Sequence, residues 1–219
     1  MHNSVQKYNN IISAIDTKIE EQKIFTSPKV IAVSKTFEMD KILPLIVYGH
    51  LEYGENKVQE AVKKWTDIKL RNPDIKLHLI GRLQTNKVKF ALKLFDYIHS
   101  VDSKKLAKKI ADEQLKQNKK IKIFLQINMG YEDQKSGINE DELDTLYNYC
   151  TELNLDVVGL MCIPPVNEEP NNFFKEMNLL NKKLNLLELS MGMSSDYLSA
   201  LENHSTYLRI GSSIFGQRD

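Results

Sequence analysis

A lysine stands at the end of a short apolar run near the start of the chain. The run is VIAVSKT, residues 30–36, in which small and branched residues lead directly into Lys35. Such a run is typical of a buried strand. Partial desolvation at the end of a strand lowers the pKa of a lysine, and a neutral amine attacks an aldehyde to form a Schiff base. The alternative is a lysine that buries its stem and extends its charge to solvent.

Two segments rich in glycine and serine follow later apolar runs. They are SMGMSSDY, residues 190–197, and RIGSSIFG, residues 209–216. Ser194 is expected at the N-cap of a helix, and Gly211 allows the backbone to approach a ligand closely. Ser212 offers a hydroxyl and an N–H group at the start of a short helical turn, an arrangement that binds phosphate. Two ordinary capped loops are the alternative.

The elements that must position these residues alternate along the chain. Segments with apolar residues three and four apart predict helices, and one such helix precedes the first strand. Alternating strands and helices indicate a parallel sheet. The short apolar runs that predict its strands are Val30–Ser34, His50–Tyr53, Lys76–Ile80, Tyr97–Val101, Ile121–Asn128, Asp156–Cys162, Leu186–Ser190 and Tyr207–Ile210.

Eight strand–helix units in 219 residues fit a (β/α)₈ TIM barrel, an α/β fold, as a single domain over residues 1–219. A doubly wound open sheet is the alternative, but it usually carries a G-x-G-x-x-G turn that is missing here. Barrels place their sites at the carboxyl ends of the strands and often bind phosphate after strands 7 and 8. Strand 8 neighbours strand 1, so Lys35 should lie beside that phosphate. A lysine that reacts with aldehydes next to a phosphate site predicts binding of pyridoxal 5′-phosphate (PLP).

Composition excludes several other classes of function. The 30 basic and 29 acidic residues give a net charge of +1, so no nucleic-acid partner is expected. No apolar run is long enough to span a membrane, and the N-terminus has no secretion signal. Cys150 and Cys162 are the only cysteines and lack metal-ligand spacing, which predicts no metal and suits the cytoplasm.

The chain resembles the YggS/PROSC family of PLP homeostasis proteins. The stretches that carry the resemblance run from the first strand nearly to the last residue: AVSKT, YGENKVQE, LHLIGRLQTNKVK, HSVDS, QKSGI, GLMCIPP, SMGMSSDY and RIGSSIFG. Each is modest evidence, but together and in this order they are specific. The last stretch is also similar to the cofactor motif of the fold-type III alanine racemases.

The resemblance implies a set of cofactor-binding residues: Lys35, Asn56, Met161, Ser194, Arg209, Gly211 and Ser212. Lys35 would carry PLP as a Schiff base, and Asn56 and Met161 would border its ring. Ser194, Gly211 and Ser212 would hold the phosphate. By the likeness to the racemases, Arg209 would face the pyridine nitrogen, where an arginine keeps that nitrogen unprotonated.

The family likeness implies a PLP carrier that buffers or delivers the cofactor without catalytic residues. Its partners would be PLP and PLP-dependent apoenzymes, with a monomer expected. Racemases that resemble the chain take a catalytic tyrosine from a second domain, and the nine residues after the predicted last strand cannot form one. The alternative is a small fold-type III enzyme such as an amino-acid racemase. A barrel that binds only phosphate is a third possibility.

Three further residues have ordinary interpretations. His78 lies within a strand, where a hydrogen-bonded core histidine is favoured over a proton shuttle. Cys162 is interpreted as a buried thiol. Lys135 is either a loop lysine facing solvent or a residue of the barrel mouth, and the sequence does not separate the two.

Overall fold

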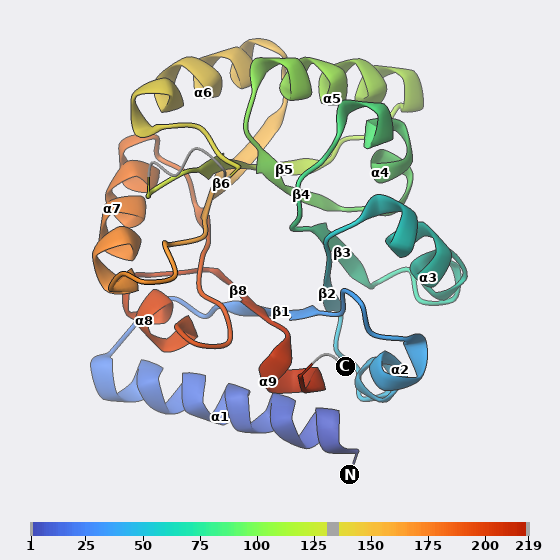
Figure 1. Cartoon of the computed structure of the whole chain (residues 1–219), viewed down its shortest axis with the longest axis vertical. Coiled ribbons are helices and arrows are strands. Elements are labelled where there is room, and N and C mark those ends of the chain that lie inside the picture. Colours follow the sequence, from blue (N-terminus) through green and yellow to red (C-terminus); the bar gives the residue numbers. More distant parts are fainter. Residues whose placement is uncertain (1, 131–135, 218–219) are drawn as a thin grey trace.

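Eight parallel strands close into a barrel in the computed structural model, which describes residues 2–130 and 136–217. The barrel closes where β1 pairs with β8 in parallel register (Figure 1). A closed barrel leaves no strand edge unpaired. The (β/α)₈ barrel expected from the sequence is therefore confirmed. The strands are β1 (Lys29–Val33), β2 (Glu52–Glu55), β3 (Lys76–Leu79), β4 (Tyr97–Val101), β5 (Lys122–Ile127), β6 (Asp156–Cys162), β7 (Glu188–Ser190) and β8 (Tyr207–Ile210).

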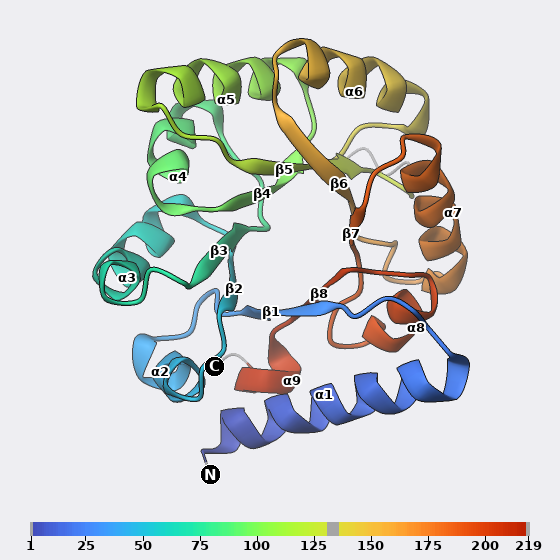
Figure 2. The ribbon, with the colours of Figure 1, turned by 180° about the vertical axis from the view of Figure 1, so that it is seen from behind.

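Helices surround the strands, as the views from the two sides of the ring show (Figures 1 and 2). The connections between successive strands contain α2 (Met39–Val47), α3 (Val58–Arg71), α4 (Val88–Leu94), α5 (Lys104–Gln117), α6 (Leu143–Glu152), α7 (Pro170–Lys183) and α8 (Tyr197–Glu202). Two short 3₁₀ turns, Thr85–Lys87 and Glu140–Glu142, lead into α4 and α6. A single-turn helix, α9 (Ser212–Phe215), follows β8.

The additional N-terminal helix expected from the sequence is present as α1 (Asn3–Gln22). It packs against α2, α8 and α9 on the outside of the barrel (Figure 1). Its buried side chains are Ser4, Val5, Ile11 and Ile15, of which Ser4, Ile11 and Ile15 recur at the spacing of one helix face. Because α9 is only one turn long, α1 covers barrel surface that a longer helix after β8 would cover.

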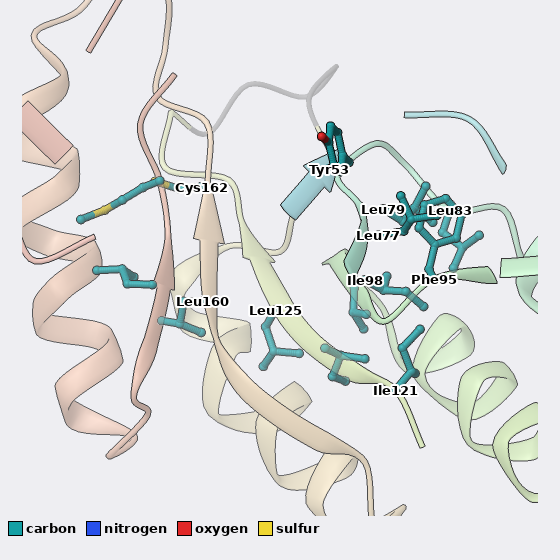
Figure 3. Packing of buried hydrophobic residues seen from close by; sticks show 14 of the residues in the cluster. Tyr53, Leu77, Leu79, Leu83, Phe95, Ile98, Ile121, Leu125, Leu160 and Cys162 are labelled. Carbon is teal, nitrogen blue, oxygen red and sulfur yellow. The ribbon is translucent and has the colours of Figure 1, made fainter. Parts of the chain in front are cut away.

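Apolar side chains pack in two places because successive strand residues point to opposite faces. The larger cluster lies between strands and helices and includes Leu77, Leu79 and Phe95 (Figure 3). The smaller one lies inside the barrel and contains Ile31, Val33, Tyr97, Phe124, Met161 and Tyr207. Part of the barrel interior is therefore packed with apolar side chains.

The strand predictions agree with the structure to within a few residues. The β4, β6 and β8 bounds match, whereas β2 begins at Glu52 and not at His50. Lys135 lies outside the described residues. Within the described ranges, no helix is long and apolar enough to cross a membrane.

Candidate functional site

A cavity of about 520 Å³ opens at the carboxyl ends of the strands. Its volume is in the range of pockets that bind small molecules and cofactors. Apolar side chains form part of its wall, and a lysine, an arginine, amides and hydroxyls form the rest. The lining residues are Val33, Lys35, Asn56, Ile80, Ile163, Met193, Ser194, Ser195, Arg209, Gly211, Ser212 and Gln217.

The cavity brings together residues from both ends of the chain. Lys35 follows β1 and Asn56 follows β2, whereas Ser194 follows β7 and Arg209 belongs to β8. The pairing of β1 with β8 is the contact that joins these segments. Of the residues named from the sequence, Lys35, Asn56, Ser194, Arg209, Gly211 and Ser212 all line this cavity.

Met161 is placed differently from the other predicted cofactor residues. Its side chain is fully buried in the interior cluster, and it does not line the cavity. Ile80 and Ile163 supply apolar wall at the cavity and pack against that cluster. The sequence suggested Met161 through the GLMCIPP stretch, and Ile163 lies two residues further along the same stretch.

The backbone on both sides of Lys35 is held by hydrogen bonds from α3. Lys64 Nζ donates to the carbonyl oxygen of Ser34 at 2.9 Å, and the Thr36 N–H donates to Glu60 Oε1 at 2.6 Å. Thr36 has a φ of 67°, which is strained for a β-branched residue. These contacts fix the turn that presents Lys35 at the end of β1.

A buried carboxylate completes this support. Glu55 Oε1 accepts hydrogen bonds from Ser34 Oγ at 2.8 Å, from Trp65 Nε1 at 2.9 Å and from Lys64 Nζ at 3.0 Å. Burial raises the pKa of Glu55, and Lys64 is the strongest of the groups that oppose this rise. We call Ser34, Glu55, Glu60, Lys64 and Trp65 the α3 clamp.

The two serine-rich loops meet at the cavity, but Ser194 does not have the local role expected from the sequence. The N-cap of α8 is Asp196, so the expectation that Ser194 caps that helix was wrong. Ser194 Oγ instead accepts a hydrogen bond from the Ser213 N–H at 3.4 Å, which links the loop after β7 to α9. A link of this kind depends on the closed barrel, because the two serines belong to different strand–helix units.

Two glycines permit close approaches around the cavity. A Cβ at Gly211 would lie 3.2 Å from the Val33 carbonyl oxygen, so the missing side chain keeps β8 close to β1. A Cβ at Gly81 would lie 2.5 Å from the Asn56 carbonyl oxygen. Gly81 therefore allows the end of β3 to pass beside Asn56, a role that only the packing of these strands reveals.

Arg209 is buried and anchored on two sides. Its Nη1 donates to Ser190 Oγ at 2.7 Å, and its Nη2 donates to the carbonyl oxygen of Cys162 at 2.7 Å. Burial lowers the pKa of Arg209, but an arginine remains protonated at physiological pH. The cavity therefore has a fixed positive group on its β8 side.

The remaining sequence interpretations concern His78 and Cys162. His78 is buried, and both of its ring nitrogens have hydrogen-bond partners, in agreement with a core histidine. Cys162 is also buried, and burial raises the pKa of its thiol to about 12. A thiol with so high a pKa is a poor nucleophile at neutral pH.

Comparison with known proteins places the chain in a family. The family model for the N-terminal domain of alanine racemase matches residues 12–219. A pyridoxal phosphate homeostasis protein of Aquifex aeolicus is 39% identical over 200 residues, which cover 87% of each chain. The chain belongs to the pyridoxal phosphate homeostasis protein family. The human member is 37% identical over 213 residues, covering 88% of this chain and 77% of the human protein.

A solved structure of this family shows the same fold. PipY of Synechococcus elongatus, a structure with PLP bound, is 31% identical to the chain. The two superpose with a TM-score of 0.80, covering 92% of this chain and all of PipY. The family resemblance inferred from the sequence motifs is therefore confirmed.

Proposed function

We propose that this protein binds PLP covalently through Lys35 and takes part in PLP homeostasis without turning over amino acids itself. The observation that carries the proposal is that Lys35 and the loops containing Ser194, Gly211 and Ser212 line one cavity. Family membership supports it, because relatives across most of the chain length are pyridoxal phosphate homeostasis proteins.

The residues of the cavity fit such a cofactor. Its volume of about 520 Å³ accommodates a ring of this size with its phosphate. Hydroxyls and backbone N–H groups at Gly211 and Ser212 match the chemistry of a phosphate. Ile80 and Ile163 offer apolar surface for a ring. The absence of a side chain at Gly211 lets the loop after β8 lie close to Val33 at the end of β1.

Each residue would have a distinct task. Lys35 would hold PLP through its amine, and the cofactor would supply the aldehyde for that covalent bond, with loss of one water. The α3 clamp would hold the Lys35 turn in place, so that little freedom is lost on binding. Ser194 and Ser212 would bind the phosphate, and Arg209 would keep a positive charge at the β8 side of the cavity.

The cavity also supports the non-catalytic part of the proposal. Racemisation needs a proton donor or acceptor on each face of the substrate. Among the described residues that line the cavity, Lys35 and Arg209 carry the titratable side chains. Arg209 keeps its proton at physiological pH, so Lys35 is left as the single candidate base within this described lining. This described lining offers no second titratable base for the opposite face of a substrate.

Covalent binding is tested with the visible spectrum. Lys35→Ala should abolish the absorbance of the lysine-bound cofactor and its reduction by borohydride, whereas Lys57→Ala, at an exposed lysine, should leave both unchanged. Mass spectrometry of the reduced protein should place the adduct on Lys35. A reducible adduct of unchanged spectrum and occupancy in Lys35→Ala would show that another lysine carries the cofactor.

Catalysis is tested by racemisation of alanine, serine, lysine and ornithine, followed by chiral chromatography. Turnover should not exceed that of free PLP, because each missing acid–base group costs roughly 10²–10⁴-fold. Turnover well above that of Lys35→Ala, retained on further purification, would make the protein an enzyme.

Transfer of PLP to PLP-dependent apoenzymes, a monomeric state and a cytoplasmic location stay predictions.

A further inference from the structure

A row of buried polar side chains crosses the barrel interior and ends at Arg209. It begins at Glu52, the first residue of β2, whose side chain is 15% exposed. His78 of β3, His99 of β4 and Ser190 of β7 follow, and all are fully buried. Because Arg209 lines the cavity, the row connects the amino ends of the strands to the candidate site.

Consecutive hydrogen bonds join these side chains. Glu52 Oε2 lies 2.6 Å from His78 Nε2, and His78 Nδ1 lies 2.9 Å from His99 Nε2. His99 Nδ1 lies 2.9 Å from Ser190 Oγ, which accepts from Arg209 Nη1 at 2.7 Å. The residues come from five different strands, and no two are neighbours in sequence.

The charges at the two ends of the row are opposite, and the rings between them are neutral. Burial lowers the pKa of His78. Burial holds the pKa of His99 well below its usual range, because protonating this ring would bring its charge close to the Arg209 guanidinium and to the His78 ring. Burial acts to raise the pKa of Glu52, but the hydrogen bond to His78 and the Lys29 ammonium lower it overall. A carboxylate and a guanidinium therefore flank two neutral imidazoles.

These charges fix the direction of every hydrogen bond. The Glu52 carboxylate only accepts, so His78 must carry its proton on Nε2. His78 Nδ1 is then an acceptor, which requires the proton of His99 on Nε2 as well. His99 Nδ1 in turn accepts from the Ser190 hydroxyl, whose oxygen accepts from Arg209. With the opposite tautomers, a ring nitrogen lone pair would face the carboxylate at 2.6 Å.

Aromatic neighbours hold both rings in this arrangement. The His78 ring stacks on Tyr97 with centroids 4.4 Å apart and planes 11° apart. The His99 ring stacks on Phe124 with centroids 4.2 Å apart and planes 19° apart. Stacking opposes ring flips, which would put a ring carbon in the place of each hydrogen-bonding nitrogen and break the row.

We propose that Glu52, His78, His99 and Ser190 are positioning residues that hold Arg209 in one orientation toward the ligand of the cavity. The role toward a ligand rests on the proposed binding of PLP. Ser190 directs its proton to His99 and so offers its oxygen to Arg209, and Cys162 anchors the other guanidinium nitrogen. The carboxylate of Glu52 thereby sets the donor arrangement at the opposite end of the barrel.

The tautomers are tested in the protein without PLP by ¹⁵N NMR of the histidine rings. His78 and His99 should both be neutral and protonated on Nε2 near neutral pH. A proton on Nδ1 of His99 in the wild-type protein would overturn the proposal. This measurement needs no cofactor, so it stands whether or not the protein binds PLP.

The role toward the ligand is tested by variants at the far end of the row. Glu52→Leu removes the acceptor, whereas Glu52→Gln keeps a carbonyl oxygen that accepts from His78. Lys29→Ala removes the ion pair with Glu52, at 3.5 Å, and keeps the row. Glu52→Leu should disturb the His99 tautomer and weaken PLP binding by roughly three- to ten-fold, as expected for one mispositioned hydrogen bond.

The two other variants should bind PLP like the wild type. The proposal would be overturned if Glu52→Leu bound PLP as tightly as Lys29→Ala and left the tautomers of His78 and His99 unchanged. If Glu52→Leu does not fold, Ser190→Ala tests the same row next to Arg209, and an unchanged affinity in that variant would also overturn it. If the wild-type protein binds no PLP, the proposed function fails. The NMR measurement of the His78 and His99 tautomers then still decides whether the hydrogen bonds of the row run in the proposed direction.

Discussion

Removing Lys64 from the α3 clamp should destabilise the protein strongly. Its side chain is 10% exposed and that of Glu55 is fully buried, so Lys64→Met leaves a buried carboxylate without its cation. Glu55 Oε2 has no hydrogen-bond partner in the described part of the chain even with Lys64 present. Breaking a buried ion pair on one side typically costs about 3–5 kcal/mol in the free energy of unfolding.

The loss should depend on pH in a defined direction. Without Lys64, the pKa of Glu55 should rise further above its unfolded value, and the folded state then binds the proton more readily than the unfolded state. Stability lost by Lys64→Met should therefore be partly regained as the pH falls toward the folded pKa. We expect a smaller loss near pH 5 than near pH 8.

Urea unfolding of the protein without PLP measures this directly. Trp65, the single tryptophan, is fully buried and donates to Glu55 Oε1, so its fluorescence reports on the clamp. Lys183→Met is the matched control, because its 2.7 Å pair with Asp144 is more than half exposed on both sides. That control should lose less than about 1 kcal/mol.

A double-mutant cycle refines the test. Adding Glu55→Gln to Lys64→Met removes the unpaired charge, and the cycle should give a coupling of about 1–3 kcal/mol. PLP binding should weaken in Lys64→Met, since Lys64 holds the Ser34 carbonyl beside Lys35. A loss no larger than that of Lys183→Met, or additive effects in the cycle, would refute the reasoning.

Two further predictions concern the phosphate and acid stability. Ser194→Ala and Ser212→Ala should each weaken PLP binding by about 1–3 kcal/mol in a spectroscopic titration. Pyridoxal without its phosphate should bind far more weakly, and equal affinity would contradict the phosphate site. Burial lowers the pKa of His50 from 6.5 to about 4, so the unfolded state takes up this proton first. Stability should fall by up to about 3 kcal/mol as pH drops across this interval. Urea titrations at several pH values measure the free energy of unfolding. His50→Asn should reduce its fall with decreasing pH, whereas His204→Asn, at an exposed histidine, should not. The same pH dependence in both variants would contradict this role of His50.

The pattern of strands and helices could be predicted from the sequence because it is local. Branched apolar runs specify buried strands, and apolar residues three and four apart specify helix faces. With eight such units the barrel follows, and its topology then brings Lys35 beside Gly211 and Ser212. The family motifs added Asn56 and Arg209, which line the same cavity.

Only the tertiary structure decided which side chains meet across different strand–helix units. It placed Met161 in the interior cluster, gave the N-cap of α8 to Asp196 and linked Ser194 to Ser213. It also assembled the α3 clamp and the row from Glu52 to Arg209. These contacts join residues far apart in sequence, and local periodicity specifies the face of a strand but not the partner that faces it. Closure of the barrel, which fixes the register of each strand against the next, determines those partners.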